Sequence, residues 1–190
     1  TFAYNNPYYT YYDRHESHPN MGYGYQGVGN GLNIHHIWPS SDLEMIQNTV
    51  DDYIHLDAFH VYYMTVSGHL HYNFTGNHMA MRHKETVSDL PYSEPVRAYL
   101  ATQLELEYAL SYLLDALESS GKLDKTLIAI SSDHYPYGLS HESIEELNGA
   151  GVDKTFERYR NAFILYATNM SGETVEKPMA SIDILPTLSN

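Results

Sequence analysis

The sequence contains no cysteine among its 190 residues. Disulfide bonds, thiolate catalysis and zinc sites built on cysteine are therefore excluded, whereas a metal site made of His, Asp or Glu side chains stays possible. Basic residues are also scarce, because 10 Lys and Arg stand against 24 Asp and Glu, a formal net charge of −14. Since phosphate backbones are bound by basic surfaces, we expect no nucleic-acid partner.

Long apolar runs and large aromatic side chains other than tyrosine are rare. No run approaches the roughly 20 apolar residues of a membrane-spanning helix. There are 1 Trp and 5 Phe, but 19 Tyr and 12 His. A tyrosine-rich surface suits sugars and polyols, because the ring packs and the hydroxyl forms hydrogen bonds. An equally open interpretation is that the tyrosines have no such meaning. The length and the 43% hydrophobic content predict one domain with a core.

The hydrophobic pattern predicts a strand, a long helix and two further strands, in that order. Three continuous runs of β-branched and aromatic residues predict buried strands, at 59–66, 126–132 and 161–167. Between the first two runs, apolar residues repeat at three- and four-residue steps from Val96 to Leu117, with Ser93 as the expected N-cap and Gly121 as the C-terminal stop. This spacing predicts a parallel strand pair with a right-handed crossover.

The remaining segments are expected to be shorter elements or loops. We expect short helices at 41–52, capped by Ser40 or Ser41, at 144–147 and at 182–188. Residues 1–40 are predicted as mostly loop with one short strand, and residues 68–90 as loop. The fold class is therefore α/β, with a mostly parallel central sheet flanked by helices.

Polar residues follow two of the predicted strands, at the edge where α/β sheets bind ligands. His69 follows the first strand, and Asp133 and His134 follow the second. An aspartate and a histidine offer a hard oxygen and an imidazole nitrogen to a divalent cation. The alternatives are a solvated turn before Pro136 and a hydrogen-bonded loop histidine. Arg14 ends a tyrosine-rich run and suits bidentate binding of a phosphate or carboxylate, or alternatively forms a surface ion pair.

Four short motifs occur in order along the chain: Thr10-Tyr-Tyr-Asp-Arg14, Met64-Thr-Val-Ser-Gly-His69, Ser132-Asp-His-Tyr135 and Ser181-Ile-Asp-Ile-Leu-Pro-Thr-Leu188. The first three resemble, in the lipoteichoic acid synthase family, a Thr-Phe-Trp-Asn-Arg stretch, a strand ending in Thr-Leu-Ser-Asn-His and a Gly-Asp-His segment. The last resembles a motif near the end of the sheet in the wider sulfatase and alkaline phosphatase superfamily. The resemblance spans nearly the whole chain.

The resemblance implies a metal site and a catalytic histidine. Asp133 and His134 match two ligands of a single divalent metal, Mn²⁺ or Mg²⁺, or Ca²⁺ if the protein is a sulfatase. His69 matches a catalytic residue that contacts the phosphate or the glycerol. The family's threonine nucleophile and a further acidic ligand match nothing in this sequence.

The resemblance also implies a substrate pocket. Arg14 matches a residue that contacts the substrate phosphate. Tyr12 falls where the family has a tryptophan that lines the pocket. Asn5 falls where the family has a histidine, a departure that puts the usual polymerase activity in doubt. We therefore expect Arg14, Tyr12, His69 and Asn5 to bind substrate.

The implied function is metal-dependent transfer or hydrolysis of phosphoglycerol-type phosphodiesters. We expect residues 1–190 to be the C-terminal portion of a single sulfatase-like catalytic domain, incomplete at its N-terminal side and inactive alone. The expected partner is an anionic lipid head group or a polyol phosphate. The resemblance places the complete protein at the extracytoplasmic face of a bacterial membrane, held by upstream helices, with these 190 residues soluble. The alternatives are a sulfatase or phosphodiesterase for another exported anionic ester, and a non-catalytic polyol- or glycan-binding relative.

Overall fold

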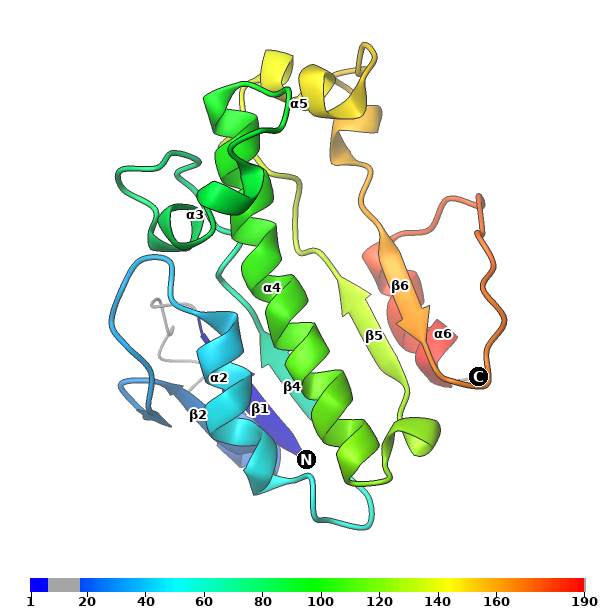
Figure 1. The fold of residues 1–190 in the computed structure, drawn as a ribbon. Coiled ribbons are helices and arrows are strands. Elements are labelled where there is room, and N and C mark those ends of the chain that lie inside the picture. Colours follow the sequence, from blue (N-terminus) through cyan, green and yellow to red (C-terminus); the bar gives the residue numbers. More distant parts are fainter. Residues whose placement is uncertain (7–17, 190) are drawn as a thin grey trace.

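A sheet of four parallel strands forms the centre of the computed structural model, which describes residues 1–6 and 18–189 (Figure 1). In spatial order the strands are β3 (Gly31–Leu32), β2 (Gly24–Val28), β1 (Phe2–Asn5) and β4 (Val61–Met64). Asn5 lies opposite Met64, so the carboxyl ends of β1 and β4 meet at one edge. The predicted α/β class with a mostly parallel sheet is confirmed.

Two helices, α2 (Asp42–Thr49) and α4 (Glu94–Ser119), cover one face of this sheet (Figure 1). The core between them includes the fully buried Tyr4, Met45 and Ile46. Because side chains alternate along a strand, Tyr4 points to the helices while Asn5 lies on the opposite face. The sheet therefore separates an apolar core from the side that carries Asn5.

The predicted helix ends are confirmed in most details. The Ser41 side chain caps α2 by accepting a hydrogen bond from the Glu44 backbone nitrogen at 2.9 Å. Gly121, with φ of +67°, follows the last turn of α4 in the left-handed conformation that favours glycine. Ser93 is the N-cap of α4, but its hydroxyl donates to Glu146 of α5 (His141–Asn148) at 2.5 Å. This contact ties α4 to α5, which is longer than predicted.

The other helical elements are short. They include α3 (His78–Arg82), α6 (Ile184–Ser189), and single turns of 3₁₀ helix at Val50–Asp52, Glu85–Val87, Leu123–Lys125, Glu157–Tyr159 and Ser181–Asp183. The helix expected at 182–188 is thus confirmed as a 3₁₀ turn followed by α6. The loop expected at 68–90 is wrong in part, because it includes α3 and a 3₁₀ turn.

The prediction of a single short strand in residues 1–40 is wrong. Three strands of the main sheet, β1, β2 and β3, come from this segment. Each has only two to five residues, which is too short to show a period of two. Pairing and burial, rather than local propensity, stabilise such strands.

The predicted parallel pairing of 59–66 with 126–132 is also wrong. Within the described residues, β4 pairs with β1 at the edge of the main sheet, while β5 (Ile128–Ser131) pairs with β6 (Phe163–Tyr166) in a second, antiparallel sheet. The crossover rule applies to two strands of the same sheet. Whether they share a sheet depends on backbone hydrogen bonds, which the hydrophobic pattern does not carry.

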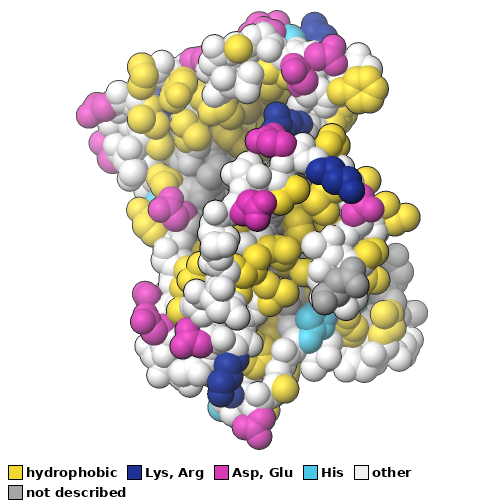
Figure 2. Space-filling view, turned by 90° about the vertical axis from the view of Figure 1, so that its right-hand side faces the viewer, with side chains coloured by type: hydrophobic (Ala, Val, Ile, Leu, Met, Phe, Trp, Pro, Cys, Tyr) yellow, Lys and Arg dark blue, Asp and Glu magenta, His cyan; other side chains and the backbone are white. Residues whose placement is uncertain are grey.

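The C-terminal part of the chain is packed thinly. Among the described residues, none after Ser143 is buried. Ile164 and Tyr166 of β6 and Leu185 of α6 are exposed. Figure 2, which views the molecule from this side, shows hydrophobic side chains spread over the middle of the surface. The main sheet with α2 and α4 therefore supplies most of the burial that stabilises the fold.

A cluster of tyrosines lies where α2 packs on the sheet. The Tyr53 and Tyr63 hydroxyls lie 3.0 Å apart, and the Tyr4 hydroxyl donates to Asp52 at 2.9 Å. Burial raises the pKa of Tyr53 to about 12, an effect that its hydrogen bond with Tyr63 partly opposes. Burial also raises the pKa values of Tyr4 and Tyr63 well above their usual range. All three phenols therefore stay protonated in the folded protein beyond the pH at which they ionise when unfolded.

We expect the free energy of unfolding to fall as pH rises above about 10, the pKa of an unfolded tyrosine. Above that pH the unfolded chain binds fewer protons than the native chain, so a rise in pH favours the unfolded state. The free energy of unfolding therefore falls by up to about 1.4 kcal/mol per pH unit for each buried phenol. Tyr53→Phe should flatten this slope in denaturant unfolding measured from pH 9 to 12. The control Val50→Ala, a buried neighbour without an ionisable group, should lower stability equally at every pH. An unchanged slope in Tyr53→Phe would contradict the assignment.

Candidate functional site

The carboxylate of Asp42 holds the carboxyl ends of β1 and β4 together. It accepts hydrogen bonds from the backbone nitrogens of Val66 at 2.9 Å and Ser67 at 2.8 Å, just after β4. The Ser67 hydroxyl and the side-chain amide of Asn6, just after β1, donate to the same carboxylate. Asp42 is fully buried; burial raises its pKa, and the hydrogen bonds from Ser67, Asn6 and Val66 oppose that shift. These hydrogen bonds fix the backbone at the carboxyl ends of β1 and β4, where the candidate site begins.

The loop that follows, which carries His69, is fixed by side chains. Four consecutive carbonyl groups, those of residues 68 to 71, accept hydrogen bonds from side-chain donors. Tyr72 donates to the first at 3.1 Å, Asn77 to the second and fourth at 2.9 Å each, and Trp38 to the third at 3.1 Å. These donors take the place of the ladder that regular structure would supply. The backbone around His69 is thus held at each of these carbonyl groups.

The imidazole of His69 contacts two aromatic residues. The Trp38 ring contacts it edge-on with centroids 5.0 Å apart. The Tyr137 hydroxyl lies 3.3 Å from Nε2 of His69. Nδ1 of His69 is 3.3 Å from the carbonyl oxygen of Leu70, an arrangement that favours a proton on Nδ1 and leaves Nε2 toward the site.

Tyr137 also links His69 to the Asp133–His134 pair. The ring of Tyr137 contacts the imidazole of His134 with centroids 4.7 Å apart. The two loops also touch directly, because a Cβ added at Gly138 would lie 2.7 Å from Cβ of Leu70. The structure therefore brings the residues after β4 and those after β5 to one place.

The donor atoms of Asp133 and His134 fit a divalent cation. Nδ1 of His134 lies 2.8 Å from the Tyr135 carbonyl oxygen, which leaves Nε2 as the nitrogen that can bind metal. Nε2 is 3.4 Å from Oδ2 of Asp133, close to the separation of about 3.0–3.4 Å for two ligands at about 2.1 Å from one ion. The Asp133 side chain is 87% exposed and so accessible. In the described ranges, no group of three His, Asp or Glu side chains is arranged around a common point. These two residues could therefore supply part of a coordination sphere.

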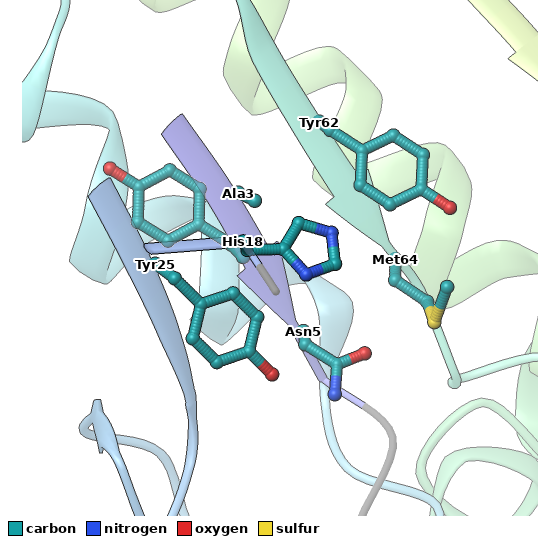
Figure 3. A pocket seen from close by; sticks show the side chains of 7 residues that line it. Ala3, Asn5, His18, Tyr25, Tyr62 and Met64 are labelled. Atoms are coloured by element: carbon teal, nitrogen blue, oxygen red, sulfur yellow. The ribbon is translucent and has the colours of Figure 1, made fainter. Parts of the chain in front are cut away.

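Asn5 is buried at the carboxyl end of β1, on the face of the sheet opposite α2 and α4. Its side chain lines a hollow of about 10 Å³ with His18, Tyr25, Tyr62 and Met64, as Figure 3 shows. That volume is about enough for one water molecule. Its role in substrate binding stays a prediction.

Arg14 and Tyr12, predicted to bind substrate, lie outside the described residues. Their roles therefore stay predictions.

Sequence reasoning missed three residues that shape this site: Trp38, Asp42 and Tyr137. Trp38 is the one tryptophan of the sequence, which was a signal, but its segment showed no period. Tyr137 lies only three residues after His134, so the sequence showed that the two residues are neighbours. It did not show that the Tyr137 side chain points toward His69. Asp42 follows the N-cap of a helix, where the helix dipole alone favours an acidic residue, so its position gave no sign of a role at the strand ends.

Comparison with known proteins places the chain in a family. The sequence matches the sulfatase family over residues 1–190, and the chain belongs to that family. The fold is similar to the crystal structure of the lipoteichoic acid synthase LtaP from Listeria monocytogenes, with a TM-score of 0.66 and 17% sequence identity. The match covers 90% of this chain and 44% of that one, so this chain spans less than half of the relative. A search of curated proteins gave no match.

Among the described residues, no helix is both long enough and apolar enough to span a membrane.

We expect Asp42→Ala to destabilise the protein and to release the His69 loop. The substitution leaves buried donors of Asn6, Val66 and Ser67 without an acceptor, at about 1–3 kcal/mol each. Denaturant unfolding should show the loss of stability, and the fluorescence of Trp38 should shift because its hydrogen bond joins the same loop. Asp57→Ala, an exposed carboxylate, is the control. Wild-type stability in Asp42→Ala would show that the carboxylate does not hold the strand ends.

Proposed function

We propose that this domain takes part in metal-dependent transfer or hydrolysis of phosphoglycerol-type phosphodiesters. Membership of the sulfatase family and the LtaP-like fold support enzyme chemistry on an anionic ester. The observation that carries the proposal is the contact of Tyr137 with both His69 and His134. It joins a candidate catalytic imidazole, just beyond the carboxyl end of β4 in the main sheet, to a candidate metal-binding pair just after β5 of the second sheet. In α/β folds, ligands bind beyond the carboxyl ends of the strands of the parallel sheet.

The chemistry of the site suits a phosphodiester. Asp133 and His134 would hold a divalent metal, Mn²⁺ or Mg²⁺, which when bound neutralises charge on phosphoryl oxygens. His69, with Nε2 toward the site, can donate a hydrogen bond to a phosphoryl oxygen or, when it is protonated, pass a proton to the oxygen of the alcohol that leaves the phosphodiester. Arg14 would neutralise a further phosphate oxygen, and Tyr12 would pack against the polyol.

Other parts of the proposal rest on the resemblance of the motifs to the lipoteichoic acid synthase family. The substrate would be an anionic lipid head group or a polyol phosphate. The complete protein would act at the extracytoplasmic face of a bacterial membrane. The family match itself favours one alternative, a sulfatase, because sulfate and phosphate esters share a tetrahedral centre with charged oxygens.

The test compares substrates in the complete protein. We expect turnover of phosphatidylglycerol that depends on added Mn²⁺ and stops with a chelator, and no turnover of p-nitrophenyl sulfate. Turnover of the sulfate ester alone would replace the proposal with the sulfatase. Metal-independent binding of glycerol 3-phosphate without turnover would replace it with a polyol-binding module.

Asp133→Ala should weaken Mn²⁺ binding and abolish turnover. Loss of groups that only support a metal ligand costs about 10–100-fold in affinity, so loss of a direct ligand should cost at least about 100-fold. The signal of free Mn²⁺ in electron paramagnetic resonance measures this affinity without any assay of activity. Asp124→Ala, an acidic residue before β5 at its other end, is the control and should bind Mn²⁺ as the wild type does. Equal affinities in the two variants would remove Asp133 from the metal site.

His69→Ala should lower kcat while Mn²⁺ affinity stays unchanged. A positioned acid or base contributes about 10²–10⁴-fold to rate, and His69 is not part of the proposed metal pair. Steady-state kinetics with phosphatidylglycerol, together with the Mn²⁺ titration, separate the two effects. His55→Ala, in an exposed turn after the first 3₁₀ helix, should behave as the wild type. A kcat within twofold of wild type in His69→Ala would exclude a catalytic role.

A further inference from the structure

Tyr137 lies between the two histidines and is open to solvent. Its hydroxyl is 3.3 Å from Nε2 of His69, and its ring contacts the imidazoles of both His69 and His134. Half of the residue is exposed, at 49%. A group large enough to touch both histidines would therefore also touch Tyr137.

The backbone of the loop after β5 fixes Tyr137 in this place. The Tyr137 nitrogen donates to the carbonyl oxygen of Tyr135 at 2.8 Å, and the Leu139 nitrogen donates to that of Pro136 at 2.9 Å. Proline sets its own φ near −65°, which narrows the conformations of this turn. Gly138 then packs against Leu70 so closely that a side chain has no room there. The phenol is thus presented by a tight turn seated on the neighbouring loop.

A phenol at this position combines two kinds of contact. Its hydroxyl both donates and accepts hydrogen bonds, and its ring packs against C–H groups. Trp38 supplies a second aromatic ring in contact with His69. The pair therefore resembles a lining for a polyol more than one for a purely charged group.

We propose that Tyr137 is a substrate-positioning residue that selects the polyol part of the ester. This inference rests on the proposed function. In the structure the Tyr137 hydroxyl shares a hydrogen bond with His69. With substrate bound, that hydroxyl bonds to a glycerol hydroxyl, and Nε2 of His69 becomes available to the phosphoryl or leaving oxygen. No covalent bond changes in this step.

The test compares two phosphodiesters in the complete protein. Phosphatidylglycerol carries a glycerol head group, whereas bis(p-nitrophenyl) phosphate has no polyol. Tyr137→Phe should raise KM for phosphatidylglycerol about fivefold, the effect of one neutral hydrogen bond, with kcat within about twofold. It should leave KM for bis(p-nitrophenyl) phosphate unchanged. The control is Tyr112→Phe, a partly exposed tyrosine of α4, which should change neither value.

A change of equal size for both substrates would overturn the proposal, because a merely structural role affects both alike. No change for either would also overturn it. If the wild type turns over neither ester, the proposed function is refuted, but the role of Tyr137 is not yet decided. Calorimetric measurement of glycerol 3-phosphate binding then tests Tyr137. Weaker binding by about fivefold in Tyr137→Phe would support the positioning role. Equal binding, or no binding to the wild type, would refute it.

Discussion

Asp42 connects the ends of two strands to the first turn of a helix through one buried carboxylate. Its partners are Asn6 after β1 and the backbone of Val66 and Ser67 after β4. A buried carboxylate is costly unless donors surround it, and here several converge on it. The arrangement fixes the point at which the His69 loop leaves the sheet. The hydrogen bonds along residues 68–71 then build on that fixed point.

A second buried carboxylate, Glu105, links the same region to the long helix. It accepts hydrogen bonds from the Ser41 hydroxyl, from Arg82 at 2.7 Å and from His83. Ser41 also caps α2, so one hydroxyl serves both the helix end and the carboxylate. Because Glu105 sits in the middle of α4, this network holds α2 and α3 on one helix. Two neighbouring residues, Ser41 and Asp42, thus join the helical layer to the sheet edge.

The candidate site lies across two sheets rather than along one. His69 belongs to the loop after β4, whereas His134 and Tyr137 follow β5, which pairs with β6 in the second sheet. The contact between Gly138 and Leu70 joins the two loops. No residue of β5 or β6 is buried, and the chain matches less than half of the LtaP chain. The geometry of the site therefore depends more on loop contacts than on a continuous sheet.

Features that depend on neighbours along the chain were predictable from local pattern. They are the period of α4, a serine cap at 40 or 41, the glycine at 121 and the apolar runs that became β4, β5 and β6. Only the structure showed that Ser41 is the cap. The motifs named His69, Asp133 and His134 as site residues. In the structure Tyr137 contacts His69 and His134, while the roles of all three stay predictions. Tertiary structure alone decided which strands pair, because backbone hydrogen bonds between distant segments leave no period in the sequence. It also decided that Trp38, Asp42 and Tyr137 meet His69 or its loop, since a side chain's direction in a loop is set by packing and not by sequence spacing.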